Sequence, residues 1–327
     1  MYQSLASWQN GAHALALLHA ALRRGYLHFL TDPRSATEVA QFAGYPADDL
    51  LTAFVAHGIV VRENDSYRLD PGLAAGLSPK TGVRLDAKIE GAVLTARQIS
   101  EAVRTGSVSP DGTDSLVSAR SVAFNPSDAA RLAVGKVLNA VPEMRDAIAH
   151  GRLLDVGSGV GGFVLTAATL LHDMRATALE VVPQVAAAAV RRAQTLGVAD
   201  RVDIRAVDAR NFEAPARYDA AFWAQPLFPE PVRPAVLAMM LRNLRPGGVL
   251  LVQQLYAAPA RDVDQGAYAL LRLVNHAQGV PFDRPLLDLV QECEAAGFAL
   301  VRTMQIDVGR LALFRRPATE SHRHESV

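Results

Sequence analysis

The residues of this chain best suited to chemistry are a run of glycines directly after an apolar segment. Gly157, Gly159 and Gly161 follow the apolar run Arg152–Val156 at alternate positions. Glycine has no Cβ, so such a loop turns sharply and lets a ligand approach the backbone. The apolar spacing then becomes helical, which brings N–H groups to a helix N-terminus, a natural site for an anion. The glycines also fit the G-x-G-x-x-G pattern, which alone is weak evidence for dinucleotide binding.

Three acids near these glycines favour a different ligand. Asp155 lies at the end of the first apolar run, where a carboxylate suits a cationic amino acid better than a pyrophosphate. Glu180 ends the second run, where an acid accepts hydrogen bonds from both ribose hydroxyls of a nucleoside. Asp208 follows the third run and is placed to accept the exocyclic amine of adenine, with Ala209 or Phe212 in apolar contact with the ring. Taken singly, Glu180 and Asp208 also fit ordinary solvated acids at strand ends or turns.

An α/β fold is expected to position these residues. Strands and helices alternate from Arg152 onward, which predicts a Rossmann-like, mainly parallel sheet with helices on both faces. The expected strands are Arg152–Val156, Arg175–Glu180, Val202–Ala206, Asp219–Trp223 and Val249–Gln254. The clearest helices are Val185–Leu196 and Arg233–Asn243, and a further helix is expected over Leu286–Ala296. Two further runs, Phe298–Ile306 and Arg310–Phe314, flank a short turn, which predicts an antiparallel hairpin that closes a seven-stranded sheet.

The segment before this sheet is mainly helical. Ala36–Phe42, with Ser35 and Glu38 at capping-box spacing, and Ala47–His57 precede a hairpin of Ile59–Arg62 and Ser66–Leu69, a winged-helix arrangement. The expected divisions are a winged-helix-like dimerisation domain over 1–84, connecting helices over 85–149, the cofactor-binding domain over 150–317 and a flexible tail over 318–327. Within the connection we expect a helix over Leu85–Arg104, a loop over Thr105–Thr113 and one or two helices over Ser115–Ala149.

Composition and charge exclude several functions. The 327 residues have a formal net charge of zero, which gives no general attraction to nucleic acid or to acidic membranes. The second helix of the winged-helix segment offers Asp48 and Asp49 and no basic residue, so it would repel phosphates. The sole cysteine, Cys293, rules out an intrachain disulfide, and no metal-ligand set is evident. No apolar run has membrane-spanning length and no secretion signal is evident, so a cytoplasmic protein is expected.

Together these motifs resemble the class I S-adenosylmethionine-dependent methyltransferases. The resemblance rests on Asp155-x-Gly-x-Gly-x-Gly, Glu180, Asp208, the Arg245-Pro-Gly-Gly248 turn and the final hairpin. With the N-terminal winged-helix segment, the architecture is similar to that of the O-methyltransferases of plant phenolics and bacterial natural products. The resemblance implies S-adenosyl-L-methionine as cofactor, an intertwined homodimer formed through the N-terminal domain, and a small-molecule acceptor.

The same resemblance implies roles for individual residues. Gly157, Gly159 and Gly161 would hold the methionine part of the cofactor, Glu180 the ribose, and Asp208 with Ala209 the adenine. Trp223 is also expected at the cofactor, since it ends the fourth strand. The substrate is expected to meet residues that follow the fourth and fifth strands or line the pocket in this family: Gln225, Phe228, Tyr256 and His276.

One departure from the family leaves the chemistry open. The family places His-Asp-Trp after the fourth strand, and its histidine deprotonates a hydroxyl; the corresponding stretch here is Phe222–Glu230, which contains no histidine. One interpretation is a substrate that loses its proton readily, such as an acidic phenol or enol, so that positioning supplies most of the rate. His276 is the candidate for a replacement base, although a lone histidine is often structural. Alternatively the acceptor is nitrogen or carbon, since Gln225-Pro-Leu-Phe228 faintly resembles the motif of amino-group methyltransferases.

The function expected from the sequence is therefore methyl transfer to a small molecule, most simply to a hydroxyl of an aromatic or polyketide-like compound. The alternatives are N- or C-methylation, or a methyltransferase fold with other chemistry. An NAD-dependent oxidoreductase would use the same glycines, but Asp155 and the closing hairpin argue against it. A DNA-binding regulator would use the winged helix, but the charge of that segment argues against it.

Overall fold

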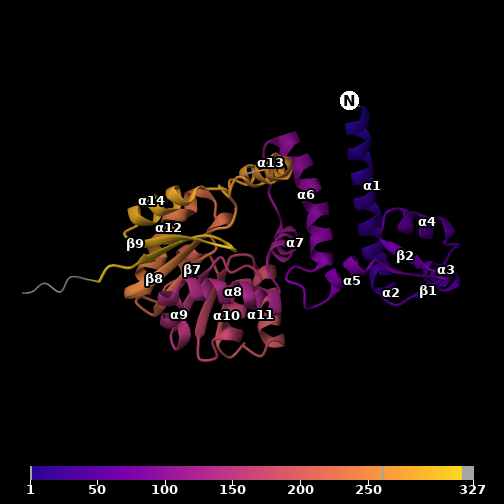
Figure 1. The fold of residues 1–327 in the computed structure, drawn as a ribbon. Coiled ribbons are helices and arrows are strands. Elements are labelled where there is room, and N and C mark those ends of the chain that lie inside the picture. The colour runs from indigo at the N-terminus through magenta and orange to yellow at the C-terminus, as the bar shows by residue number, and fades with distance from the viewer. Residues whose placement is uncertain (1, 260, 319–327) are drawn as a thin grey trace, which may run out of the picture.

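The larger part of the molecule is a sheet with helices on both faces (Figure 1). The computed structural model describes residues 2–259 and 261–318. Its seven-stranded sheet has the order β6-β5-β4-β7-β8-β10-β9. Neighbouring strands from β6 to β8 pair in parallel, whereas β10 is antiparallel to both β8 and β9. The strands are β4 (Arg152–Val156), β5 (Arg175–Glu180), β6 (Val202–Ala206), β7 (Tyr218–Trp223), β8 (Leu244–Gln254), β9 (Ala299–Ile306) and β10 (Gly309–Arg315). The expected parallel sheet with a closing hairpin is confirmed.

Two apolar clusters join the helices to the two faces of this sheet. One face is covered by α8 (Asp128–Ala140), α9 (Pro142–Ala149), α10 (Gly162–Leu170) and α11 (Pro183–Thr195), the other by α12 (Arg233–Asn243) and α14 (Leu286–Ala295). Successive residues of a strand point to opposite faces, so Leu153 packs in the first cluster and Leu154 in the second. Burial on both faces explains why β4 reads as a continuous apolar run.

The N-terminal segment has a small core of its own. It comprises α1 (Tyr2–Arg24), α2 (Tyr26–Phe29), β1 (Arg34–Ser35), α3 (Ala36–Ala43), α4 (Asp48–Ala56), β2 (Val60–Glu63), β3 (Ser66–Leu69) and α5 (Pro71–Leu77). The expected capping box is present, because the Ser35 hydroxyl accepts the Glu38 N–H and the Glu38 carboxylate accepts the Ser35 N–H at 2.7 Å. The expected hairpin is also present, with Glu63 paired to Ser66.

Long helices connect this segment to the sheet. After α6 (Leu85–Thr105) come three helices, α7 (Gly112–Val122), α8 and α9, where one or two were expected. The predicted loop also ends earlier than expected, because Asp111 accepts the N–H groups of Thr113 and Asp114 and so starts α7 at Gly112. Another helix, α13 (Asp262–Ala277), packs against α6.

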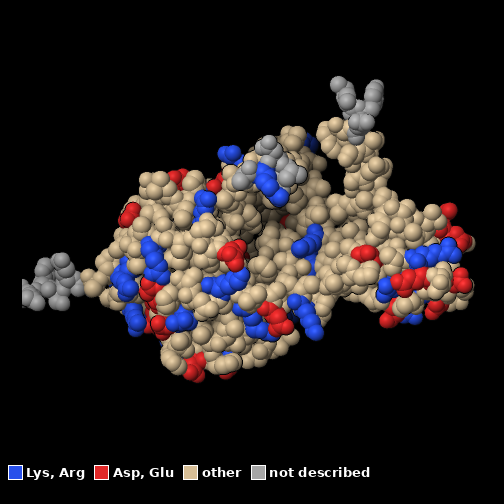
Figure 2. Space-filling view, viewed as in Figure 1, with Lys and Arg blue, Asp and Glu red and all other residues tan. Residues whose placement is uncertain are grey.

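The charge distribution on the surface agrees with the formal net charge of zero. Acidic and basic side chains are interspersed in Figure 2, including over the N-terminal segment, and the surface is hollowed between the α6–α13 region and the sheet. Within the described parts of the chain, no helix combines the length and apolar character needed to cross a bilayer. Of the expected tail over 318–327, residues 319–327 lie outside the described residues.

Candidate active site

The strand register brings the predicted acids to one edge of the sheet. Asp155 in β4 pairs with Ala178 of β5 and with Phe222 of β7, and Glu180 at the end of β5 pairs with Ala206 of β6. Asp208 follows β6 directly. Because all these strands are parallel, their carboxyl ends lie together, which is where open α/β sheets bind ligands.

The loop after β4 requires glycine for two reasons: its backbone conformation, and the lack of room for a Cβ at two of the three positions. Gly157, Gly159 and Gly161 have φ values of 75°, 56° and 80°, in the left-handed region. A Cβ on Gly157 would lie 2.5 Å from a ring carbon of Phe228, and one on Gly161 would lie 2.7 Å from Leu165. A Cβ on Gly159 would meet nothing within 4 Å. The loop therefore leaves a side-chain-free cradle at Gly159.

Glu180 is fixed against this cradle. One carboxylate oxygen accepts the Gly159 N–H at 3.1 Å, and the other accepts the Val182 N–H at 2.8 Å. Burial raises the pKa of Glu180, while these backbone hydrogen bonds act in the opposite direction. The carboxylate is thus oriented before any ligand arrives, and each oxygen retains a further lone pair.

Asp155 is buried without a partner. It is 1% exposed, and neither carboxylate oxygen has a hydrogen bond. Burial raises the pKa of Asp155 to about 7; the nearby Val164 N–H, which does not reach hydrogen-bond geometry, acts in the opposite direction, and the charge of Glu180 adds to the effect of burial. A buried ionised carboxylate is costly unless it is compensated, so this arrangement suits a cationic ligand. The hydroxyl of Ser158, in the loop itself, is also buried and unbonded.

Asp208 forms an ion pair with a neighbouring arginine, Arg210. Its carboxylate is bridged by Arg210, with an Nη2–Oδ2 distance of 2.6 Å, which together with the Arg210 N–H holds its pKa below the usual value. Ala209 starts the 3₁₀ turn η1 (Ala209–Asn211) and is buried, as is Phe212. An adenine bound at Asp208 would therefore have to share this carboxylate with Arg210.

Two predicted ligand contacts are instead placed in the protein interior. Trp223 is fully buried, with the Arg233 guanidinium carbon 4.6 Å from the centroid of its ring. Gln225, in the turn η2 (Gln225–Leu227), is 1% exposed; its amide donates to the Gln253 carbonyl and accepts from Arg233. These positions do not favour direct ligand contact by either side chain.

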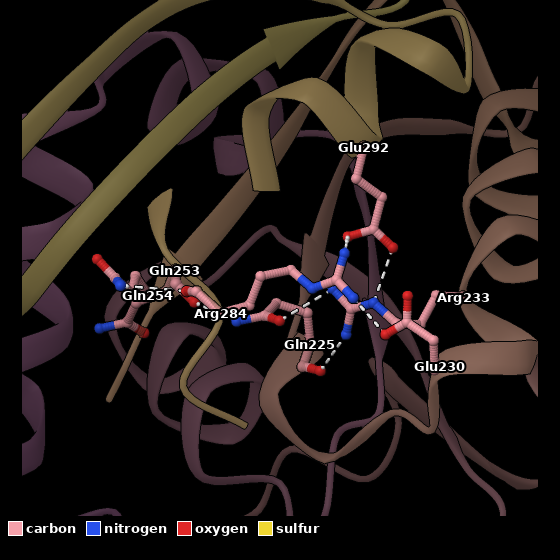
Figure 3. A network of polar contacts seen from close by, with 7 residues as sticks. All are labelled: Gln225, Glu230, Arg233, Gln253, Gln254, Arg284 and Glu292. Carbon is pink, nitrogen blue, oxygen red and sulfur yellow. Dashed lines mark hydrogen bonds and ion pairs between the residues drawn. The ribbon is translucent and has the colours of Figure 1, made fainter. Parts of the chain in front are cut away.

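The network around Gln225 was not foreseen from the sequence (Figure 3). Arg233 is fully buried; it donates to the Gln225 carbonyl at 2.9 Å and to both carboxylate oxygens of Glu292 at 2.7 Å. Arg284 pairs with Glu230, which lies in the turn η3 (Glu230–Val232), and lies 3.8 Å from Glu292. The signal in the sequence is Arg233 at the start of α12, directly before the apolar run 234–241.

The aromatic candidates lie nearer to the surface. Phe228 follows η2, contacts Trp223 edge to face at 5.7 Å between centroids, and covers Gly157. Tyr256 follows β8 and contacts Phe282 at 4.9 Å, and its burial raises the pKa of its hydroxyl. Phe228 is therefore the substrate candidate that lies directly on the glycine loop.

His276 has the partner expected of a positioned base. Its Nε2 lies 3.3 Å from Oδ1 of Asp283, whose Oδ2 accepts the Tyr268 hydroxyl at 2.7 Å. Burial tends to raise the pKa of Asp283, but the hydrogen bonds from Tyr268 and His276 and the charge of Arg272 outweigh it and keep that pKa low. Asp283 is therefore ionised at neutral pH and orients the imidazole.

The structure does not bring His276 together with the glycine loop in one described cavity. His276 lines a cavity of about 500 Å³ between α6 and α13, with Ala102, Gly106 and Arg272 among its neighbours. In the described part of the chain, no group of three or more His, Cys, Asp or Glu side chains is arranged to hold a metal ion.

Comparison with known proteins agrees with this architecture. Residues 153–248 match a family described as a methyltransferase domain. No curated protein sequence matches the chain.

Solved structures of similar fold cover nearly the whole chain. Mitomycin 7-O-methyltransferase shares 20% identity over 96% of this chain and 97% of its own, with a TM-score of 0.73. Human N-acetylserotonin methyltransferase, solved in complex with S-adenosylmethionine, shares 17% over 97% and 98%, with a TM-score of 0.66. The N,N-8-amino-8-demethyl-D-riboflavin dimethyltransferase of Streptomyces davawensis shares 18% over 98% and 99%, with a TM-score of 0.65. At this level of identity, the similarity establishes the fold.

Proposed function

We propose that this chain, which contains a methyltransferase domain and has the fold of the class I methyltransferases, transfers a methyl group from S-adenosylmethionine to a small molecule. The observation that carries the proposal is the side-chain-free cradle at Gly159, next to the oriented Glu180 and the unpartnered, buried Asp155. Two carboxylates beside a bare loop suit a cationic nucleoside and would repel a pyrophosphate. NAD is therefore the poorer fit.

In this reaction each residue of the site would have a separate binding or positioning role. S-adenosylmethionine supplies a methyl group already activated on a positively charged sulfur. Glu180 would hold the ribose, and Asp155 would compensate the positive charge. Gly159 would admit the ligand to the backbone. The protein must mainly align the acceptor with this methyl group and exclude water, and Phe228 is placed beside Gly157 to form part of such a wall.

We expect Glu180→Ala to weaken S-adenosylmethionine binding by about 1–3 kcal/mol, roughly 5- to 150-fold, because hydrogen bonds to a charged group are lost. Isothermal titration calorimetry with S-adenosylmethionine measures this loss. Glu294→Ala, an exposed acid on α14, is the matched control and should bind normally. Thermal unfolding without ligand checks that the variant is folded. Unchanged affinity in Glu180→Ala, or tight NAD binding with no S-adenosylmethionine binding, would refute the proposed site.

Methylation of a hydroxyl is the preferred reaction, with His276 as the base. The supporting observation is the His276–Asp283 contact at 3.3 Å, since a carboxylate beside an imidazole fixes the orientation and tautomer of the ring. The side chain of His276 is 43% exposed, so an acceptor has access to it. Methylation of nitrogen is the alternative, because a solved relative is a dimethyltransferase of an amino-riboflavin and the usual family histidine is missing.

His276→Ala should lower turnover at least about 100-fold while leaving cofactor affinity intact, as expected when a general base is removed. Release of S-adenosylhomocysteine with a panel of small phenols and aromatic amines measures turnover. His150 also contacts an aspartate, Asp173 at 3.1 Å, but on the exposed surface, so His150→Ala is the control. Equal turnover in both variants would assign His276 to structure and leave an acidic acceptor as the explanation.

A homodimer formed through the N-terminal segment is also part of the proposal. The long helix α1 leaves Leu5 and Trp8 exposed, with Trp8 72% accessible, and large apolar side chains that gather on a surface commonly mark protein contacts. DNA binding is not proposed, since α4 carries Asp48 and Asp49 in its first turn.

A further inference from the structure

Three arginines from α7 and α11 line a pocket between these two helices and the segment that contains Asn125. Arg120 of α7 and Arg191 and Arg192 of α11 line a cavity of about 260 Å³, together with Asn125 and Thr195. No acidic residue lines it. The pocket therefore concentrates positive charge in a molecule whose formal net charge is zero.

These guanidinium groups have no acidic partner among the described residues. Arg205, Arg210, Arg233 and Arg245 of the same domain each pair with an acid, whereas Arg120, Arg191 and Arg192 gather around one pocket that no acid lines. Arg192 is half-buried, and burial with the nearby charge of Arg120 lowers its pKa to about 10. A partly desolvated cation next to a second cation is unfavourable unless an anion compensates both.

Arg192 is also held in place for a ligand. Its Nη2 donates to Oδ1 of Asn125 at 2.7 Å, and its Nη1 lies 3.4 Å from the carbonyl oxygen of Val160 in the glycine loop. Ala188, which lines the pocket, packs against the same Val160. The guanidinium is thus anchored from behind by neutral acceptors, and its charge is left for the pocket.

We propose that this pocket binds a small molecule carrying phosphoryl groups, at a site separate from the cofactor cleft. Planar guanidinium groups match phosphate oxygens with paired hydrogen bonds. Three of them around a volume of this size suit a ligand with two phosphoryl groups. The inference does not depend on methyl transfer, since the arginines lie outside the proposed active site.

Calorimetric titration with inorganic pyrophosphate at constant ionic strength tests this site. We expect saturable binding of one pyrophosphate per chain to the wild-type protein. Arg120→Gln and Arg191→Gln should each weaken binding at least about tenfold, because one charge-assisted hydrogen-bonding group is lost. Both side chains are exposed and unpaired in the structure, so these variants are expected to fold normally.

The matched control is Arg152→Gln, which removes the same charge from an exposed position at the start of β4. It should bind pyrophosphate as the wild type does. The proposal is overturned by an absence of saturable binding, or by equal weakening in all three variants, which would indicate only general electrostatic attraction. A normal S-adenosylmethionine titration of the same samples keeps this result separate from that of the proposed function.

Discussion

Arg233→Met is expected to reduce the free energy of unfolding by about 3–5 kcal/mol, the usual cost of removing one partner of a buried ion pair. Arg233 is fully buried, whereas the side chain of Glu292 retains 14% exposure. The substitution removes the Arg233 donors of the Glu292 carboxylate and of the Gln225 side-chain oxygen, while the Gln225 carbonyl keeps the Phe228 N–H at 3.1 Å. Arg284 remains 3.8 Å from Glu292 and offsets part of the loss, which favours the lower end of the range. Urea unfolding at pH 7 measures the change.

Two further variants separate this effect from a simple loss of charge. Arg145→Met breaks an exposed pair with Asp146 and should cost less than about 1 kcal/mol. Arg233→Met combined with Glu292→Leu should recover much of the lost stability, because no uncompensated charge remains in the interior. A single variant as stable as Arg145→Met would mean that water reaches Glu292 and that the network is not a structural element.

The same network accounts for the burial of Gln225 in the turn after β7, where the sequence predicts a substrate contact. Gln225 was predicted to contact substrate because it follows a strand end. Sequence position places a residue at the edge of the sheet but does not tell whether it points to the cleft or the core. The partners that decide this, Arg233 and Glu292, lie on two helices 59 positions apart, and no local pattern joins them.

The sheet, by contrast, was predictable from the sequence. Buried parallel strands such as Arg152–Val156 must be apolar throughout, and a helical period follows each one, so the alternation is visible locally. The helices between Leu85 and Ala149 were less predictable. Their boundaries depend on single caps, Asp111 and Ser127, and one polar residue in a Gly-, Ser- and Pro-rich stretch is a weak signal.

The proposed cofactor site, formed by the glycine loop with Asp155, Glu180 and Asp208, was only partly predictable from the sequence. Glycines with positive φ and acids at strand ends follow from backbone requirements, so the sequence predicts where Gly159 and Glu180 lie in the fold; their part in cofactor binding stays a prediction. The solvation of each acid was not predictable. Asp155 is buried with no partner, while Asp208 is bridged by Arg210 two residues later. The difference arises from the packing above each strand end and gives the two acids different electrostatic roles.

Asp155→Asn is expected to stabilise the ligand-free protein at pH 8 by up to about 4 kcal/mol. Burial raises the pKa of Asp155 to about 7, compared with about 3.9 in an unfolded chain. Between these values the unfolded state is ionised while the folded state keeps the proton, so the wild type loses stability as pH rises from about 4 to 7. Asparagine does not ionise and avoids this loss. Three pKa units at 1.36 kcal/mol each set the upper limit.

The difference between wild type and variant should therefore shrink toward zero near pH 4, and urea unfolding at several pH values measures it. Asp146→Asn, at an exposed acid, controls for the change of charge. If the unfolding free energies of wild type and Asp155→Asn stay parallel from pH 4 to 8, Asp155 is solvated and the electrostatic basis of the site is wrong.

The same substitution should weaken S-adenosylmethionine binding at pH 8 at least about tenfold, since the charge that compensates the cationic ligand is gone. Wild-type affinity should rise with pH through about 7, because the ligand favours the ionised carboxylate. Binding near pH 7 should therefore release a proton from the protein. Calorimetry in buffers of different ionisation enthalpy detects this release, and comparison with Asp155→Asn removes protons that come from the ligand. If Asp155→Asn is both more stable and a poorer binder than the wild type, the burial of Asp155 lowers stability while its charge stabilises the bound ligand. Such a trade-off between stability and function is typical of functional sites.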